Sequence, residues 1–155
     1  MTHLIGLSGS LRQGSYNSAL LRAAEARMPA GSTLAIASIR GIPLYDGDDE
    51  TAHGIPGVAK NAIDWLSRPA ADIGRVFGGK PVALFGASPG GFGTVLSQNA
   101  WLPVLRTLGA ELWSGGRMLV SRAGQVFDAN GSIVDAKIDE ALRRFVEGFV
   151  RHVRR

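Results

Sequence analysis

The first 21 residues constrain the fold more than any other part of the chain. Residues 4–7, Leu-Ile-Gly-Leu, form an apolar run of the length of a short buried strand. A loop rich in glycine and hydroxyl groups follows at residues 8–17, and the apolar run at residues 18–21 indicates a helix. A loop between a strand and a helix N-terminus presents backbone N–H groups to an anion. The opening stretch therefore predicts a strand, a phosphate-binding loop and a helix.

Length and composition are typical of a single compact domain over residues 1–155. Hydrophobic residues make up 45% of the chain and charged residues 19%. Since no apolar run reaches the roughly 18 to 20 residues that span a bilayer, and residues 1–3 lack the pattern of a secretion signal, we expect a cytoplasmic protein that contacts no membrane. The net charge of +4 is accompanied by no nucleic-acid-reading motif, so we expect no nucleic-acid partner.

Metal and thiol chemistry are not expected. The chain has no Cys, and His3, His53 and His152 lack the spacing of metal ligands. The acidic residues 46–50 lack the ligand spacing of a calcium loop, so we interpret them as a solvated loop.

Helices and strands alternate along the rest of the chain. The periodicity predicts helices at residues 19–28, 58–67, from about 94 to 108 and from 135 onward, and strands at residues 32–39, 81–86 and 117–120. In the helix at residues 58–67 we expect Ile63, Trp65 and Leu66 to be buried. Residues 81–86 are apolar on both faces, as in a central parallel strand. The alternation indicates an α/β fold with a parallel sheet.

A second glycine-rich loop, residues 87–94, follows that central strand. Ligands of such sheets bind at the carboxyl ends of the strands, so the loops at residues 8–17 and 87–94 are expected to face one ligand. Gly90 and Gly91 would allow a flat ligand to approach the backbone closely. For the first loop, a helix cap at Ser15 or Asn17 is the alternative interpretation.

The second loop also fits a serine hydrolase pattern. Residues 86–90 read Gly-x-Ser-x-Gly, and Asp128 or Asp135 and then His152 follow in the order of a catalytic triad. However, Pro89 directly after Ser88 has no backbone N–H for an oxyanion hole. A nucleophilic Ser88 is therefore the less favoured interpretation.

Several segments together resemble the NADPH-dependent FMN reductase family, whose members have a flavodoxin-like fold. Gly9-Ser10-Leu11-Arg12 with Ser15 and Asn17 is similar to the family's phosphate loop. Residues 56–69 are similar to its third helix, and residues 79–82 and 86–91 to its fourth strand and flavin loop. The motifs occur in the family's order and span nearly the whole chain.

The resemblance implies an FMN-dependent NAD(P)H oxidoreductase in which no side chain acts as a catalytic acid or base. Hydride would pass from NADPH or NADH through FMN to a quinone, flavin, azo or metal-oxyanion acceptor. The residues expected to hold the phosphate are Ser10, Arg12, Ser15, Tyr16 and Asn17, and those expected to line the flavin ring are Ser88, Pro89, Gly90 and Gly91. Members of the family tend to form dimers and tetramers, so the resemblance implies a homo-dimer or homo-tetramer.

One part of the family pattern is missing from this sequence. The family has a further helix, a central third strand and a Pro-Glu-Tyr-Asn loop before its third helix, whereas this chain passes from Pro56 directly to Gly57. Such a unit has about 25 to 30 residues. Without strand 3, the flavodoxin order 2-1-3-4-5 predicts a four-stranded sheet in the order 2-1-4-5. Alternatively, a partner chain fills the slot by swapping, or the protein folds with impaired or no flavin catalysis.

Overall fold

The computed structural model describes residues 1–42 and 54–155 of the chain. The strands are β1 (Thr2–Leu7), β2 (Ser32–Ala37), β3 (Pro81–Val82), β4 (Phe85–Ala87), β5 (Glu111–Leu112) and β6 (Met118–Val120). The α-helices are α1 (Tyr16–Glu25), α2 (Gly57–Leu66), α3 (Ile73–Val76), α4 (Val95–Thr107), α5 (Ala123–Val126) and α6 (Ala136–Val153), and a 3-10 turn, η1 (Ala70–Asp72), precedes α3. The predicted solvated loop at residues 46–50 and His53 lie outside the described residues.

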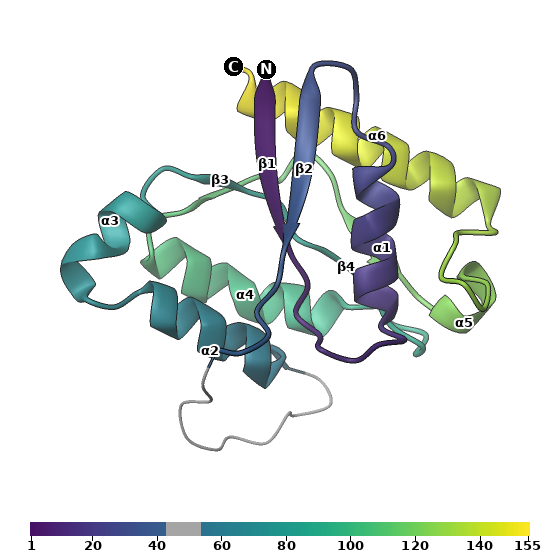
Figure 1. Cartoon of the computed structure of the whole chain (residues 1–155), viewed down its shortest axis with the longest axis horizontal. Coiled ribbons are helices and arrows are strands. Elements are labelled where there is room, and N and C mark those ends of the chain that lie inside the picture. Colours follow the sequence, from purple (N-terminus) through teal and green to yellow (C-terminus); the bar gives the residue numbers. More distant parts are fainter. Residues whose placement is uncertain (43–53) are drawn as a thin grey trace.

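The helices form two layers with the strands between them. Helices α1 and α6 cover one side, while α2 and α4 lie together on the other (Figure 1). The two chain ends lie next to each other, because the Arg154 guanidinium donates to Thr2 Oγ1 at 3.1 Å. No helix in the described part of the chain is long and apolar enough to cross a membrane.

The strands of residues 1–42 and 54–155 pair in parallel, so the predicted α/β fold with parallel pairing is confirmed. β1 pairs with β2, β3 with β5, and β4 with β6. Residues 81–86, predicted as one strand, are divided into β3 and β4, and each part pairs with its own partner.

The predicted strand order 2-1-4-5 is found only in part. Its pairs 2-1 and 4-5 are present, but no backbone ladder within the described residues joins β1 to β3 or β4. At β4 the physical reason is visible, because the Ala87 N–H donates to the side-chain oxygen of Asn17 at 2.8 Å instead of to a strand carbonyl. The sheet is therefore split between β1 and β4.

The hydrophobic core lies on one side of β4 and β6. It is formed by apolar side chains of α1, β4, β6, α5 and α6, with no buried member from β1 or β2. Its fully buried side chains include Leu20 of α1, Val120 of β6 and Leu142 of α6. Asp135 starts α6 by accepting from the Lys137 and Ile138 N–H groups. The apolar face of this helix packs into the core through Leu142, Phe145 and Val146.

The face of β1 that carries Ile5 and Leu7 is poorly covered. Ile5 is 76% exposed and Leu7 46%, although both are large apolar residues in a strand. The prediction that Trp65 and Leu66 of α2 are buried is wrong, because both are exposed, while Asn61 and Ala62 are the buried residues of that helix. Apolar side chains of β1 and of α2 are thus exposed to solvent.

Candidate functional site

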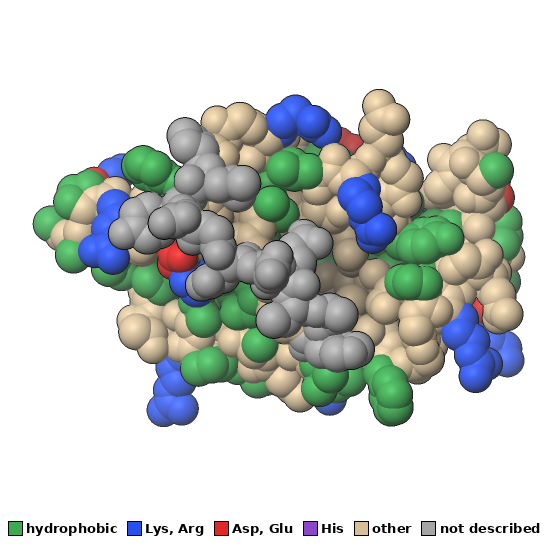
Figure 2. Space-filling view, turned by 90° about the horizontal axis from the view of Figure 1, so that it is seen from below, with side chains coloured by type: hydrophobic (Ala, Val, Ile, Leu, Met, Phe, Trp, Pro, Cys, Tyr) green, Lys and Arg blue, Asp and Glu red, His purple; other side chains and the backbone are tan. Residues whose placement is uncertain are grey.

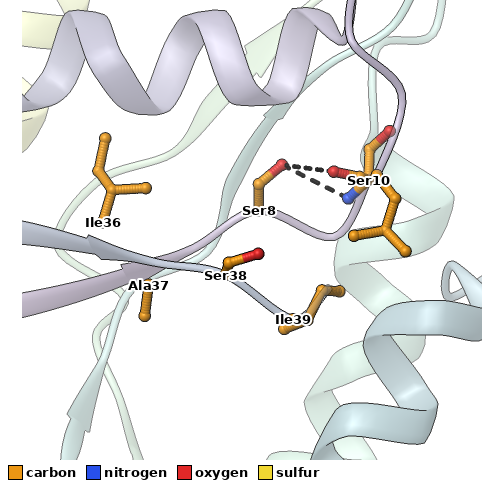
Figure 3. Close-up of a pocket in the computed structure, with 7 residues that line it drawn as sticks. Ser8, Ser10, Ile36, Ala37, Ser38 and Ile39 are labelled. Carbon is orange, nitrogen blue, oxygen red and sulfur yellow. Dashed lines mark hydrogen bonds between the residues drawn. The ribbon is translucent and has the colours of Figure 1, made fainter. Parts of the chain in front are cut away.

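The first loop is organised by serine hydroxyls. Ser8 Oγ is 2.9 Å from Ser18 Oγ on α1. The same Ser8 hydroxyl lies 3.4 Å from both the N–H and the C=O of Ser10, at the limit of hydrogen bonding (Figure 3). Ser8 and Ser18 were not among the predicted site residues, although the density of hydroxyls in residues 8–18 could have indicated them. Together these contacts hold the loop against the N-terminus of α1.

Ser15 caps helix α1. Its side chain accepts from the Ser18 N–H at 3.3 Å, and the residue is only 2% exposed. The cap explains why the helix begins at Tyr16, earlier than the periodicity of the apolar residues predicted. The alternative role of Ser15 as a helix cap is therefore confirmed, and its hydroxyl still has a proton to donate.

Arg12 and Tyr16 occupy different environments. Arg12 is exposed and forms no ion pair with any carboxylate of the described residues, so its guanidinium is available to an anion. The Tyr16 ring instead stacks on Phe127, with ring centroids 5.7 Å apart. Tyr16 therefore joins the start of α1 to the segment after α5.

Asn17 brings the two predicted loops together. Its side-chain oxygen accepts from the Ala87 N–H, which directly precedes Ser88. Because that oxygen is engaged, the NH₂ group of Asn17 is the part that can contact a phosphate. The N-terminus of α1 and the end of β4 are thereby held side by side at the carboxyl edge of the strands.

The second loop is held from the opposite direction by the segment after β6. The Ser88 N–H donates to the Val120 carbonyl at 2.9 Å, and the Ala123 N–H donates to the Ser88 carbonyl at 3.0 Å. The Ser88 hydroxyl accepts from the Gly90 N–H at 3.2 Å. Pro89, Gly90 and Gly91 are exposed at the tip of this loop.

Glycine at position 91 is not required by the folded chain itself. A Cβ at Gly91 would meet no atom within 4 Å, and its φ lies outside the left-handed region. Gly93 differs, because its φ is +60° and a Cβ there would lie 3.3 Å from the Leu119 backbone. An exposed glycine without a structural need is suited to close contact with a ligand.

The cavity beside the first loop is small. It has a volume of about 150 Å³ and lies at the carboxyl ends of β1 and β2, between Ser8, Ser10 and Ser38 on its polar side and Ile36 and Ile39 on its apolar side (Figure 3). Pockets that enclose drug-sized ligands have roughly 300 to 1,000 Å³. A ligand as large as a flavin would therefore lie across the surface of this edge. Figure 2 views the molecule from this side, where isolated Lys and Arg side chains stand among hydrophobic ones.

The residues of the serine hydrolase pattern are not assembled. His152 lies 3.0 Å from Glu111, the residue of β5 that pairs with Pro81 at the start of β3. Ser88 follows the other end of this strand region, after β4. Within residues 1–42 and 54–155, no group of three His, Asp or Glu side chains is placed to hold a metal ion.

Comparison with known proteins shows the family to which the chain belongs. The sequence model of the NADPH-dependent FMN reductase family matches residues 50–125. An NAD(P)H-dependent FMN reductase of Pseudomonas aeruginosa is 35% identical over 98% of this chain and 95% of its own length. The chain belongs to the NADPH-dependent FMN reductase family. The resemblance to this family that the sequence motifs indicated is thereby confirmed. The family description names the FMN and NADPH that the resemblance implied.

Further relatives extend the comparison to other acceptors and to a solved structure. A 2-hydroxy-1,4-benzoquinone reductase of a Burkholderia species is 31% identical over 94% of this chain and 93% of its own length. The structure of FerB, a flavoenzyme NAD(P)H:(acceptor) oxidoreductase from Paracoccus denitrificans, superimposes with a TM-score of 0.83 at 26% identity. The superposition covers 97% of this chain and 96% of FerB. The flavodoxin-like fold is confirmed by this superposition.

Proposed function

We propose that this protein binds FMN across the loops at residues 10–17 and 88–91 and acts as an FMN-dependent NAD(P)H oxidoreductase. The hydrogen bond from Ala87 to Asn17 carries the proposal, because it places the N-terminus of α1 beside the second glycine-rich loop. Family membership supports the same cofactor.

The phosphate of FMN is assigned to the first loop. Arg12 supplies a positive charge, and the first turn of α1 contains no acidic residue that would repel an anion. Ser10 and Ser15 offer hydroxyl protons and Asn17 its NH₂ group. Tyr16 positions the helix start through its contact with Phe127.

The flavin ring is assigned to the second loop. Ser88 fixes the loop through its bond from the Gly90 N–H, while Pro89, Gly90 and Gly91 present an exposed backbone surface to the ring. When bound, FMN supplies the hydride chemistry, and the chain supplies orientation and polarity. No side chain is required as a catalytic acid or base.

The acceptor is proposed to be a small molecule of the quinone, flavin, azo or metal-oxyanion class. Support comes from relatives that are named as quinone reductases in Burkholderia and Pseudomonas putida. We further propose that the protein is cytoplasmic and forms a homo-dimer or homo-tetramer. Light scattering of the purified protein would test the oligomeric state.

A second candidate is a deletion form of this fold with impaired or no flavin catalysis. The alignment with the P. aeruginosa relative is 179 positions long, whereas this chain has 155 residues, so at least 24 positions face a gap in this chain. The split between β1 and β4 and the exposure of Ile5 also favour it. We propose that the family's third strand and its loop are the missing part, which removes one wall of the flavin site.

Flavin titration tests the binding proposal. FMN and riboflavin would be added to apoprotein while the quenching of flavin fluorescence is followed. We expect saturable quenching with FMN and at least about tenfold weaker binding of riboflavin, because riboflavin lacks the phosphate that Arg12 would bind. No quenching by FMN would refute the proposed site.

A matched pair of glycine variants examines the ring surface. Gly91→Ala is expected to weaken FMN binding without changing the midpoint of thermal unfolding, since a Cβ has free space there. Gly74→Ala in α3 also has free space but lies away from both loops, so it should leave FMN affinity unchanged. Equal FMN affinity of both variants would contradict the ring assignment.

Turnover separates the two candidates. NADPH oxidation by the FMN-loaded protein in the presence of a benzoquinone supports the oxidoreductase. A folded protein that binds FMN but does not oxidise NADPH supports the deletion form.

A further inference from the structure

Arg122 has an unfavourable backbone conformation. It lies between β6 and α5 with φ 48° and ψ 44°, in the left-handed region. It is the only non-glycine residue with positive φ in residues 1–42 and 54–155. Side chains other than glycine, Asn and Asp rarely adopt this conformation, because the Cβ approaches the following carbonyl oxygen.

The backbone of Arg122 is tied to the second glycine-rich loop. Its N–H donates to the Gly90 carbonyl at 3.0 Å, and the next residue, Ala123, donates to the Ser88 carbonyl at 3.0 Å. The backbone of Arg122, a residue with an exposed cationic side chain, therefore lies next to residues 88–90 at the carboxyl end of β6.

The guanidinium of Arg122 has no carboxylate partner within the described part of the chain. The residue is exposed, and none of the ion pairs between described residues includes it. The nearest carboxylate in the sequence, Asp128, accepts instead from the N–H groups of Asn130 and Ser132 in its own turn. The left-handed backbone carries an energetic cost, and residues held in such conformations cluster at ligand-binding sites.

We propose that Arg122 binds a phosphate group of NAD(P)H and positions the dinucleotide against the second loop, residues 88–91, to which the flavin ring is assigned. The inference rests on the proposed function. The first loop has its own cation, Arg12, for the phosphate of FMN, while Arg122 is bonded to the loop against which the hydride donor must lie. Arg122 is thus a substrate-binding residue that determines dinucleotide affinity.

The test compares Arg122→Gln with Arg117→Gln in FMN-loaded protein. Arg117 precedes β6 and is also exposed, so it is the same charge at the opposite end of the same strand. Calorimetric titration with NADP⁺ and NAD⁺ measures binding without turnover. We expect Arg122→Gln to weaken NADP⁺ binding by about tenfold or more, with FMN affinity unchanged, and Arg117→Gln to bind like the wild type.

The two dinucleotides distinguish the phosphate. Equal losses for NADP⁺ and NAD⁺ would place Arg122 on the pyrophosphate, whereas a loss for NADP⁺ alone would place it on the 2′-phosphate. Both outcomes support the proposal. Unchanged NADP⁺ binding, or a loss of FMN affinity in its place, would overturn it.

Arg122→Gly separates binding from a structural role. Glycine adopts the left-handed conformation freely, so the melting temperature should equal or exceed that of the wild type while NADP⁺ affinity falls as in Arg122→Gln. A lower melting temperature with unchanged NADP⁺ affinity would overturn the proposal. Wild-type protein that binds no FMN would refute the proposed function itself, which is a different result from normal NADP⁺ binding by Arg122→Gln.

Discussion

The β1–β2 and β4–β6 ladders have similar apolar sequences but very different surroundings. Met118 and Val120 of β6 are 3% and 0% exposed, whereas Ile5 and Leu7 of β1 are 76% and 46% exposed. Helices α1 and α6 pack against the β4–β6 ladder and build the core there. The β1–β2 ladder contributes no buried residue to that core.

The difference shows that an apolar strand sequence specifies burial only when its neighbours are present. In a flavodoxin-like sheet the strand at the position of β1 is central and has a partner on each side. Here β1 has β2 on one side and no strand on the other within the described residues. This arrangement is what loss of the family's third strand would produce.

The largest effect on stability is expected from a substitution in the core that covers the β4–β6 ladder. Leu142→Ala removes a fully buried side chain of α6 and should lower the free energy of unfolding by about 2 to 5 kcal/mol. Urea denaturation followed by circular dichroism measures the loss. A loss below about 1 kcal/mol would show that this core is not the main source of stability.

The second largest effect on stability is expected at the hydrogen bond between Asn17 at the start of α1 and Ala87 of β4. Asn17→Ala leaves the buried Ala87 N–H without its acceptor and should cost about 1 to 3 kcal/mol. Asn17→Asp keeps an acceptor oxygen and should recover most of that stability, while its negative charge weakens FMN binding at the first loop. Equal destabilisation by both variants would argue against the role of this hydrogen bond.

A smaller effect is expected where the chain ends meet. The Arg154 guanidinium donates to Thr2 Oγ1, Ser32 Oγ and the carbonyls of Ala30 and Gly31, at the start of β1 and β2. Arg154→Ala should cost about 1 kcal/mol because these bonds are exposed to water. Arg155→Ala, for which the described residues show no side-chain bond, is the control and should leave the urea midpoint unchanged.

The smallest effect is expected on the open strand. Ile5→Thr keeps a β-branched residue and removes apolar surface that is already exposed to water, so the change should be within about 0.5 kcal/mol. Thermal unfolding of this variant beside Leu142→Ala gives the contrast directly. A large loss in Ile5→Thr would mean that Ile5 is covered in solution.

Much of the fold could be predicted from the sequence because local signals were strong. The apolar periodicity predicted helices at residues 19–28 and from 135 onward, which contain the buried Leu20 and Leu142. The exact start of α1 depends on its cap, Ser15, which was the alternative interpretation of that residue. The exposure of Trp65 and Leu66 could not be predicted, because periodicity shows which face of a helix is apolar but not whether a sheet covers it.

The site was predictable at the level of loops and less so at the level of single contacts. Glycine and hydroxyl density marked residues 8–17 and 87–94. The engagement of Asn17 with Ala87 depends on residues 70 positions apart, and the left-handed Arg122 follows from tertiary bonds to Gly90. Neither contact has a local sequence signal.

Amide hydrogen exchange of β1, resolved by residue with NMR, tests the open sheet most directly. The Thr2 N–H donates to the Gly31 carbonyl, and residues in a parallel ladder alternate in direction, so the N–H groups of Leu4 and Gly6 point toward β2. Those of Ile5 and Leu7 point to the other edge. We predict protection at Leu4 and Gly6 and rapid exchange at Ile5 and Leu7. Equal protection at all four positions would contradict the account, because it would require a further strand on the outer edge of β1.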